Sequence, residues 1–173
     1  MAPSPVRVLV VCTGNICRSP MGHSLLLEEL EGDPRFEIDS AGVSAEERGN
    51  PVDSRANAAL RRGGRNAMRH TARRVSPQDM ANSHLILGMT SNHVRTLRRW
   101  AEEYGTDPSV IRMWREFDPA APRLADGARE SDLDVDDPWY GDAAGFDLTL
   151  TELEAGLPGI IEHIEELAAS RGI

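Results

Sequence analysis

Cys12 and Arg18 are two residues near the start of the chain whose types and spacing could carry out chemistry on a phosphoryl group. A cysteine thiolate is a strong nucleophile, and a guanidinium can bind two oxygens of a phosphoryl group at once. The pair therefore predicts nucleophilic attack by Cys12 while Arg18 binds the charged oxygens. Taken alone, this spacing is a weak pattern, and a buried structural cysteine is the alternative.

The residues around this pair favour the catalytic interpretation, because they place it between a strand and a helix. The run of residues 6–11 is typical of a buried strand, whereas Ser19 and Pro20 are typical of a helix cap followed by the first helical residue. A loop that enters a helix can turn its backbone N–H groups inward as an anion site, to which the helix dipole adds positive potential. We expect this field, Arg18 and the supporting hydroxyl of Ser19 to stabilise the Cys12 thiolate.

The expected phosphate-binding loop lies between the first strand and the first helix, and two of its residues suit a tight turn. Gly14 tolerates unusual backbone angles, and Asn15 can adopt a left-handed conformation or brace the loop through its amide. The backbone amides of the loop would then surround a phosphate-sized dianion. The residues expected to bind phosphate are Thr13, Gly14, Asn15, Ile16, Cys17 and Arg18.

Beyond this loop, strand and helix patterns alternate along the chain. We predict further strands at residues 36–40, 84–87 and 110–114, helices at 19–30, 53–63, 91–103 and 146–169, a kink in the last helix at 156–159, and a polar loop over 118–145. The alternation implies an α/β fold, as a single three-layer domain over residues 1–173 with a parallel sheet flanked by helices. In such sheets ligands bind beyond the carboxyl ends of the strands, which is where Cys12 lies.

Charge and composition exclude several classes of protein. Residues 1–100 carry 14 Arg and 10 acidic residues, a balance of +4, whereas residues 101–173 carry 5 Arg and 18 acidic residues, a balance of −13. The basic half suits an anionic substrate, although solvated helix faces are the commoner reason for such a balance. The net charge of −9 disfavours nucleic-acid binding. The sequence contains no Lys, which excludes Schiff-base chemistry and the GK[ST] phosphate loop.

The cysteines and apolar runs bear on the location of the protein. The two cysteines, Cys12 and Cys17, provide no disulfide framework that would indicate an oxidising compartment. The longest early apolar run is shorter than a secretory signal core, and no stretch approaches the length of a membrane span. We therefore expect a cytoplasmic protein without membrane insertion. The oligomeric state is left open by the sequence, with a monomer as the expectation.

Residues 11–20 resemble the signature of the low-molecular-weight protein tyrosine phosphatases. Further matches follow in the family's order over nearly the whole chain, at residues 40–42, 70–73, 88–89 and 136–141, and the segments 117–119 and 157–159 look especially like bacterial members. The resemblance implies a four-stranded parallel sheet flanked by helices. It also implies a phosphoric monoester hydrolase that needs no cofactor and whose partner is a phosphotyrosine-containing protein.

The resemblance singles out one aspartate as the proton donor. By composition, Asp132, Asp134, Asp136 and Asp137 are equal candidates, and an acidic loop is usually just solvated. Only Asp137 matches the family's Asp-Pro-aromatic-aromatic-Gly motif at the position of its general acid. It would give a proton to the departing tyrosine oxygen and later take one from the water that hydrolyses the phosphocysteine.

The substrate cleft is also assigned through the resemblance. Trp139 and Tyr140 match an aromatic pair that would form one wall around the phenyl ring, with Ile16 on the floor. Packing of these aromatics in the core is the alternative, which suits a polar loop less well. Glu46 stands on the opposite wall, where many members have an aromatic residue. We expect a more open cleft there that disfavours acidic phosphopeptides.

Several residues receive supporting roles. The resemblance assigns His70 to steadying the phosphate loop and makes Cys17 a redox partner that forms a reversible disulfide with Cys12, with a second thiol of no redox duty as an equal alternative. Thr90 stands where the family commonly has Asp, so one hydrogen bond near the site is expected to be missing. No metal site is expected, because the remaining histidines lack metal-ligand spacing and are predicted to be surface or packing residues: His23, His84, His93 and His163.

Three other functions compete with this interpretation. An arsenate reductase of the same fold relays oxidation through further cysteines, and this chain has none after Cys17. A protein arginine phosphatase typically has Thr at the position of Ile16, whose apolar side chain suits an aryl leaving group instead. A phosphotyrosine-binding module without catalysis, suggested by Glu46 and Thr90, fits poorly with the retained cysteine, arginine and aspartate.

Overall fold

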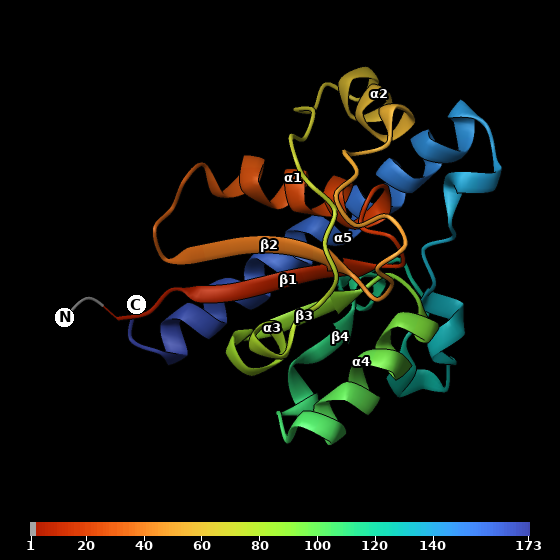
Figure 1. The fold of residues 1–173 in the computed structure, drawn as a ribbon. Helices are drawn as coiled ribbons and strands as arrows, with labels where there is room; N and C mark the ends of the chain where they lie inside the picture. Colours follow the sequence, from red (N-terminus) through yellow and green to blue (C-terminus); the bar gives the residue numbers. More distant parts are fainter. Residues whose placement is uncertain (1–2) are drawn as a thin grey trace.

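The protein is built on one parallel sheet, as seen in a computed structural model that describes residues 3–173. The first two residues of the predicted domain, 1–173, lie outside the described part. The sheet has the order β2-β1-β3-β4, and every neighbouring pair of strands is parallel (Figure 1). This confirms the predicted α/β fold with four strands. The strands are β1 (Val6–Cys12), β2 (Phe36–Gly42), β3 (Leu85–Gly88) and β4 (Ile111–Met113).

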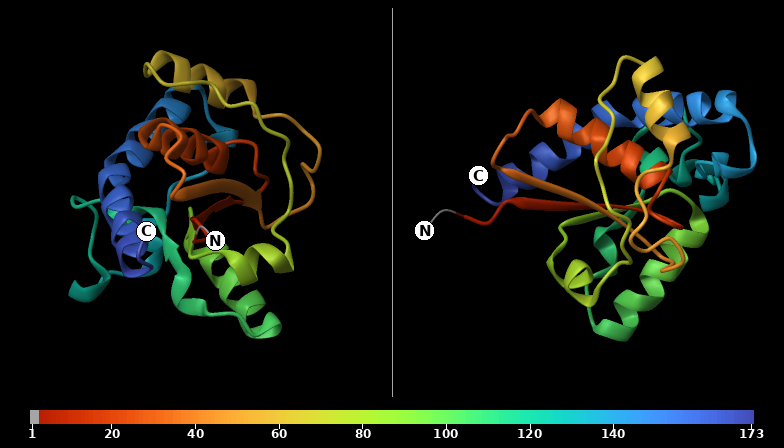
Figure 2. Two further views of the ribbon diagram at one scale, coloured as in Figure 1. Left: turned by 90° about the vertical axis from the view of Figure 1, so that its left-hand side faces the viewer. Right: turned by 45° about the horizontal axis from the view of Figure 1, so that its top comes forward.

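Helices cover both faces of the sheet, which gives the three predicted layers (Figure 2). The α-helices are α1 (Arg18–Leu30), α2 (Ser54–Arg62), α3 (Pro77–Asn82), α4 (Ser91–Tyr104) and α5 (Ala143–Ser170). The 3-10 helices are η1 (Pro108–Val110), η2 (Trp114–Phe117), η3 (Leu124–Asp126), η4 (Glu130–Leu133) and η5 (Pro138–Tyr140). None of the helices within residues 3–173 has both the length and the apolar character needed to cross a membrane.

The alternation of side chains along β1 divides the hydrophobic core into two clusters. Val8 and Val10 belong to the cluster that contains the buried faces of α1, α2 and α5. Leu9 and Val11 belong to the cluster on the other face, with apolar residues of α3 and α4. Because successive side chains of a strand point to opposite faces, a strand buried on both sides needs apolar residues at nearly every position. Cys12 continues the first alternation and therefore faces α1.

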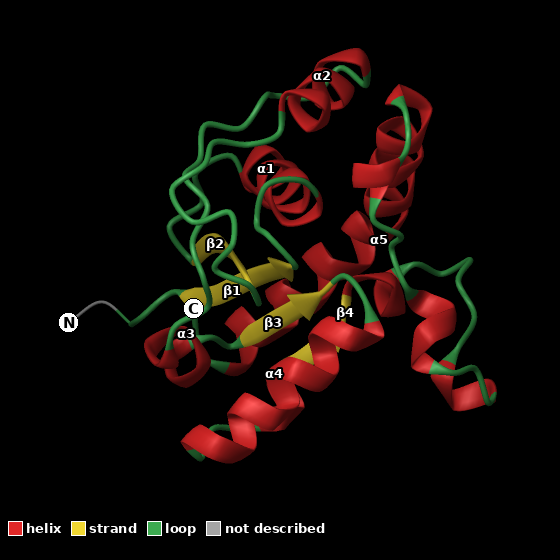
Figure 3. Ribbon diagram, turned by 45° about the vertical axis from the view of Figure 1, so that its right-hand side comes forward, coloured by secondary structure: helices red, strands yellow, loops and turns green. Residues whose placement is uncertain are grey.

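The two neighbouring strands β1 and β3 send their following helices to opposite faces of the sheet. α1 follows β1 on one face, and α4 follows β3 on the other (Figure 3). The outgoing segments diverge at the carboxyl ends of these strands and leave a crevice of the kind in which ligands bind in parallel sheets. The chain thus positions the starts of α1 and α4 at the same place.

The sequence prediction needs correction at two places. Residues 118–145 are not one loop, because they contain η3, η4 and η5 and because α5 begins at Ala143. The helix α3 was not predicted, although Ser76, Pro77 and Asp79 form a capping box around its start. The last helix continues through Pro158 as a single element, and the kink at 156–159 stays a prediction. A Cβ at Gly159 would lie 2.3 Å from the carbonyl oxygen of Phe117, so glycine there permits close packing of α5 against η2.

Candidate active site

The segment from Cys12 to the first turn of α1 is buried and tightly curved. Asn15 has a φ of 60°, the predicted left-handed conformation, and is fully buried. Gly14 has no such φ, so its φ does not require the tolerance for unusual backbone angles that was predicted for it. Its small size matters instead, because a Cβ there would lie 2.9 Å from the side chain of Glu47. Gly42 permits a still closer approach, since its Cβ would lie 2.5 Å from the carbonyl oxygen of Thr13.

Ser19 is not the cap of α1, contrary to prediction. The helix already begins at Arg18, and its cap position, Cys17, makes no side-chain cap hydrogen bond. The hydroxyl of Ser19 lies instead 3.0 Å from the Cys12 sulfur and accepts a hydrogen bond of 2.8 Å from the amide of Asn15. Because that amide is a donor, the hydroxyl hydrogen of Ser19 is free to point at the sulfur. Ser19 thus supports a thiolate at Cys12, in the supporting position that was predicted.

The orientation of Asn15 is fixed by its other two partners. Its Oδ1 accepts hydrogen bonds from the backbone N–H of Arg73, at 3.0 Å, and from Nε2 of His70, at 2.7 Å. Since a backbone N–H can only donate, the side-chain oxygen must face Arg73, and the amide nitrogen then faces Ser19. Burial lowers the pKa of His70, which keeps its ring neutral at pH 7. His70 therefore lies against the loop as the sequence predicted.

Arg18 is nearly inaccessible, at 3% exposure, and connects the loop to a distant segment. Its Nη1 donates to the carbonyl oxygen of Val135 at 2.9 Å. Its Nη2 lies 3.5 Å from a carboxylate oxygen of Asp137 and 3.4 Å from the hydroxyl of Thr13. The Nε of Arg18 is buried without a partner among the described residues. A guanidinium that is fixed by a hydrogen bond to a backbone carbonyl and still has an N–H group without a partner is suited to bind an anionic ligand.

Asp137 is the aspartate of its segment that reaches the cavity. It caps η5 by accepting the N–H of Trp139 at 3.0 Å, and its side chain is 39% exposed. The other candidates are used elsewhere or exposed: Asp134 accepts the N–H of Ser91 at 2.7 Å, Asp132 accepts the N–H of Arg129, and Asp136 lies at the surface outside the cavity. The geometry therefore distinguishes four residues that composition could not.

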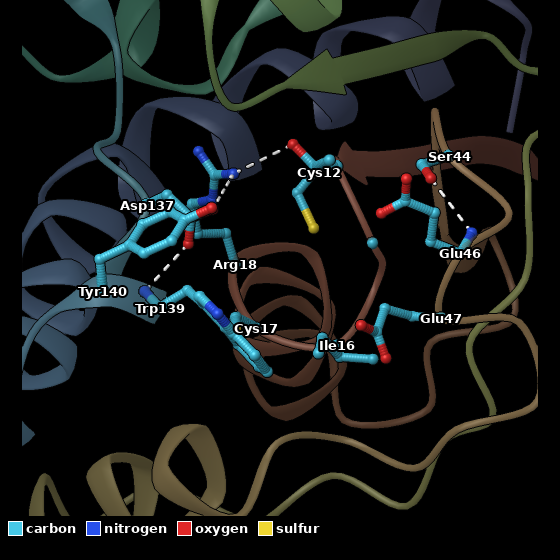
Figure 4. Close-up of a pocket in the computed structure, with 12 residues that line it drawn as sticks. Cys12, Ile16, Cys17, Arg18, Ser44, Glu46, Glu47, Asp137, Trp139 and Tyr140 are labelled. Atoms are coloured by element: carbon cyan, nitrogen blue, oxygen red, sulfur yellow. Dashed lines mark hydrogen bonds and ion pairs between the residues drawn. The ribbon is translucent and has the colours of Figure 1, made fainter.

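A cavity of about 180 Å³ joins these groups (Figure 4). Figure 4 shows Trp139 and Tyr140 on one side of Cys12, with Glu46 and Glu47 on the other. Tyr140 is 90% exposed, which excludes the alternative that it packs in the core. The lining residues are Cys12, Thr13, Gly14, Ile16, Cys17, Arg18, Ser44, Glu46, Glu47, Asp137, Trp139 and Tyr140.

Four residues at this site were not predicted to belong to it. Ser44 and Glu47 follow β2 beside Glu46, and this adjacency was a signal that could have found them. Arg55 lies over the ring of Trp139 at 4.9 Å and donates to its carbonyl oxygen at 3.1 Å. His93 contacts the hydroxyl of Thr13 at 2.8 Å, across 80 positions of sequence, rather than serving only as a surface or packing residue. For Arg55 and His93 the sequence offers no signal, since neither stands in a motif.

Thr90 and Cys17 qualify two further expectations. Thr90 forms a reciprocal capping box with His93 at the start of α4, so this position is hydrogen-bonded despite the absence of Asp.

Cys12 and Cys17 are both free thiols and both buried. Burial, with the nearby Asp53 carboxylate, raises the pKa of the Cys17 thiol above its usual range. The disulfide between the two cysteines stays a prediction. Among residues 3–173, no cluster of three His, Cys, Asp or Glu could hold a metal ion.

Comparison with known proteins gives a consistent result. The family described as low molecular weight phosphotyrosine protein phosphatase matches residues 7–170. The low molecular weight protein-tyrosine phosphatase A of Mycobacterium tuberculosis is 35% identical over 172 residues, which cover 97% of each chain. A crystal structure of a protein tyrosine phosphatase from Entamoeba histolytica, with Hepes in its active site, has a TM-score of 0.79 and 25% identity, and covers 93% of this chain and 97% of its own.

A second kind of phosphatase shares the fold. The structure of YwlE, from Bacillus subtilis, is described as an arginine phosphatase in a mutant with a phosphorylated active-site serine. It has a TM-score of 0.75 and 26% identity, and covers 92% of this chain and 96% of its own. The same architecture is therefore found with two different phosphorylated substrates.

Proposed function

The chain belongs to the low molecular weight phosphotyrosine protein phosphatase family, and from this membership we propose that it hydrolyses phosphotyrosine in proteins through a phosphocysteine on Cys12. It is a protein-tyrosine phosphatase, as its named relatives are. The observation that carries the proposed mechanism is the cavity lined jointly by Cys12, Arg18 and Asp137, three residues from two distant segments. Each has the chemistry that one part of the reaction requires.

In the first step the Cys12 thiolate attacks phosphorus as the bond from phosphorus to the tyrosine oxygen breaks. The departing oxygen takes the proton of Asp137, so that a neutral phenol leaves and the carboxylate remains. The support for this assignment is that Asp137 is exposed enough to exchange protons with water yet lines the cavity that contains Cys12. Arg18 and the loop amides of residues 13–18 bind the three equatorial oxygens.

In the second step water attacks the phosphocysteine and the sulfur–phosphorus bond breaks. The Asp137 carboxylate takes a proton from this water, inorganic phosphate is released, and the Cys12 thiolate is restored. The hydroxyl of Ser19, 3.0 Å from the sulfur, stabilises the thiolate both as nucleophile and as leaving group. We propose that no metal ion takes part, because Arg18 and the loop amides supply the positive charge.

An aromatic substrate is favoured by the shape of the cleft. Ile16 offers an apolar floor, and Trp139 and Tyr140 offer flat apolar surfaces at one wall, which suit a phenyl ring. Phosphoserine is too short to bring its phosphate to Cys12 while using these contacts. We propose a phosphotyrosine-containing protein as the partner, and action as a monomer in the cytoplasm.

Phosphoarginine is the second candidate substrate, for one specific reason. Glu46 and Glu47 place two carboxylates on the wall opposite the aromatic pair, where they could pair with a guanidinium. The apolar Ile16 argues against it, since it offers no polar contact to that group. A comparison of kcat/KM for matched phosphotyrosine and phosphoarginine peptides decides between the two.

The proposed function is tested by hydrolysis of p-nitrophenyl phosphate and a phosphotyrosine peptide in the presence of chelator and reductant. We expect turnover by the wild type, none detectable with Cys12→Ser, and a loss of about 10²-fold or more with Asp137→Asn. Activity that requires added metal would contradict the mechanism. Tight binding of the peptide by the wild type without turnover would favour a binding module instead.

A further inference from the structure

Thr13 carries the hydroxyl nearest in sequence to the nucleophile, and this hydroxyl is held from two sides. Its Oγ1 lies 2.8 Å from Nε2 of His93 and 3.4 Å from Nη2 of Arg18. Thr13 lines the cavity together with Cys12. The two neighbours come from the starts of α1 and α4, the helices that diverge at the crevice between β1 and β3.

The tautomer of His93 is set by the start of α4. The backbone N–H of Thr90 donates to Nδ1 of His93 at 3.1 Å, within a capping box in which Thr90 Oγ1 in turn accepts the N–H of His93. A backbone N–H can only donate, so Nδ1 carries no hydrogen. A neutral imidazole then has its hydrogen on Nε2, the atom that faces Thr13.

His93 is held neutral by its surroundings. The residue is 3% exposed, and its ring lies near the guanidinium of Arg18. Burial, reinforced by this positive charge, lowers the pKa of His93 to about 3. His93 is therefore a hydrogen-bond donor to Thr13 at every pH at which the enzyme would be assayed.

The Thr13 hydroxyl oxygen thus accepts from two N–H groups that cannot accept in return. Its own hydrogen is therefore free to point to a third group, and Thr13 is an exposed residue that lines the cavity together with Cys12. We infer that the Thr13 hydroxyl donates a hydrogen bond to the phosphoryl group in this cavity, and that His93 is the positioning residue that keeps the hydroxyl in this donor role.

This inference rests on the proposed function, since it names a further contact to the same phosphoryl group. It differs from the predicted role of Thr13, which was to bind phosphate through its backbone amide. It also gives the Thr90 position a purpose: the capping box orients His93, and His93 orients Thr13. The three residues form a chain of hydrogen bonds from the backbone of α4 to the substrate.

Two pairs of variants test the inference. Thr13→Val removes the hydroxyl at nearly constant shape, and Thr13→Ser retains it. His93→Asn retains an oxygen that can accept the Thr90 N–H and removes the donor to Thr13. We expect Thr13→Val to lower kcat/KM for a phosphotyrosine peptide, and the affinity for vanadate, by about tenfold or more, because a hydrogen bond to a charged group is lost. Thr13→Ser should stay within about threefold of the wild type.

The double variant separates positioning from simple structural support. His93→Asn should reduce activity severalfold in the wild-type background and cause no further loss in the Thr13→Val background, since its effect passes through the hydroxyl. Equal effects in both backgrounds, or a Thr13→Val enzyme indistinguishable from the wild type, would overturn the inference. Circular dichroism of each variant reveals a folding defect. If Thr13→Val is misfolded, the activity of Thr13→Ser relative to the wild type tests the role of the hydroxyl instead.

A spectroscopic measurement reports on His93 without relying on activity. Correlation of imidazole ¹⁵N and ¹H signals should show His93 with hydrogen on Nε2 and none on Nδ1 between about pH 5 and pH 8. Hydrogen on Nδ1 would overturn the inference. If the wild type failed to hydrolyse phosphotyrosine, the proposed function would fall, whereas the vanadate affinities and the tautomer would still decide the role of Thr13 and His93.

Discussion

The phosphate loop and the segment that carries Asp137 face the same cavity but are built in opposite ways. In the loop, Asn15 and Ser19 are completely buried and Arg18 nearly so. In the other segment the side chain of Asp137 is 39% exposed, and Tyr140 is 90% exposed. The loop is braced by the hydrogen bonds of Asn15. The other segment is attached to the rest of the molecule through Val135, whose carbonyl accepts from Arg18 and whose N–H donates to the carbonyl of Met89, and through Asp134, which accepts the N–H of Ser91.

The difference corresponds to the two chemical tasks. Donors that stabilise a phosphoryl group are most effective when they are desolvated and fixed before the reaction. A group that gives and takes a proton must exchange with water between the steps, and a segment at the surface allows substrate to enter and leave. We therefore expect changes in the loop to alter binding of the phosphoryl group and stability together, and Asp137→Asn, which retains an oxygen that can accept the N–H of Trp139, to alter mainly proton transfer.

The largest effect is expected from Arg18→Lys, because Arg18 contacts both regions. An ammonium group cannot bind two phosphoryl oxygens side by side while donating to Val135. We expect kcat/KM for p-nitrophenyl phosphate to fall by about 10³-fold. The matched control is Arg35→Lys, whose partners Asp33 and Glu165 lie away from the cavity, and it should retain full activity. A loss of less than tenfold for Arg18→Lys would contradict the assigned role.

The next effect tests whether the loop is preorganised by Asn15. Asn15→Ala removes three hydrogen bonds and places alanine at a φ of 60°. We expect a loss of about 2–4 kcal/mol in the free energy of unfolding and about tenfold in kcat/KM. Asn15→Gly relieves the backbone strain but not the lost hydrogen bonds, so it should recover only part of the stability. Urea unfolding of the wild type and the two variants measures these differences. An Asn15→Ala protein as stable as the wild type would contradict the proposed bracing of the loop by Asn15.

A moderate effect is expected from pH, because His23 is buried against Ser40 and His93 is buried against Thr13. Burial lowers the pKa of His23 to about 4 and that of His93 to about 3. In the unfolded chain both take up a proton near pH 6.5, while in the folded protein they do not. Their contribution to stability is therefore complete above about pH 6.5 and is lost as the pH falls toward 4, by up to about 1.4 kcal/mol per pH unit for each histidine.

Urea unfolding at about pH 7.5, 6 and 5 measures this slope. His23→Asn should make the slope shallower, because one of the buried histidines no longer titrates on unfolding. Equal stability of the wild type at all three values would contradict the assignment.

The smallest effect is expected at the open wall of the cleft. Glu46 is exposed, so its charge acts on a peptide through solvent. We expect Glu46→Gln to raise kcat/KM for an acidic phosphotyrosine peptide by about two- to threefold at low salt and not at high salt. Glu103→Gln, at the far end of α4, is the matched control. An increase with both variants would show that net charge, rather than the cleft wall, is responsible.

Much of the fold was predictable because it follows local patterns. The valine-rich run of β1, the hydrophobic periodicity of the helices and the position of Cys12 at a strand end were enough to predict the sheet and the place of the site. The start of α1 was misjudged, because Ser19 and Pro20 have the residue types of a cap and first helical position. In the folded protein the hydroxyl of Ser19 contacts the Cys12 sulfur instead.

The site was predictable only where a motif stood in one stretch of sequence. Asp137 could be separated from its neighbouring aspartates only through family resemblance, since all four are equivalent by composition. His93 and Arg55 contact the cavity-lining residues Thr13 and Trp139 through the packing of α4 and α2, far along the chain from the residues they contact. No pattern in a single sequence specifies such contacts, because they depend on how the layers pack.

The most direct test of the two-region account is a leaving-group series. Aryl phosphates whose phenols differ in acidity would be hydrolysed by the wild type, Asp137→Asn and Asn15→Ala. The departure of a more basic oxygen depends more on proton donation. The factor by which Asp137→Asn lowers kcat/KM should therefore grow as the phenol becomes a weaker acid. The factor by which Asn15→Ala lowers kcat/KM should be nearly constant across the series. A loss with Asp137→Asn that is the same for every phenol would contradict the account.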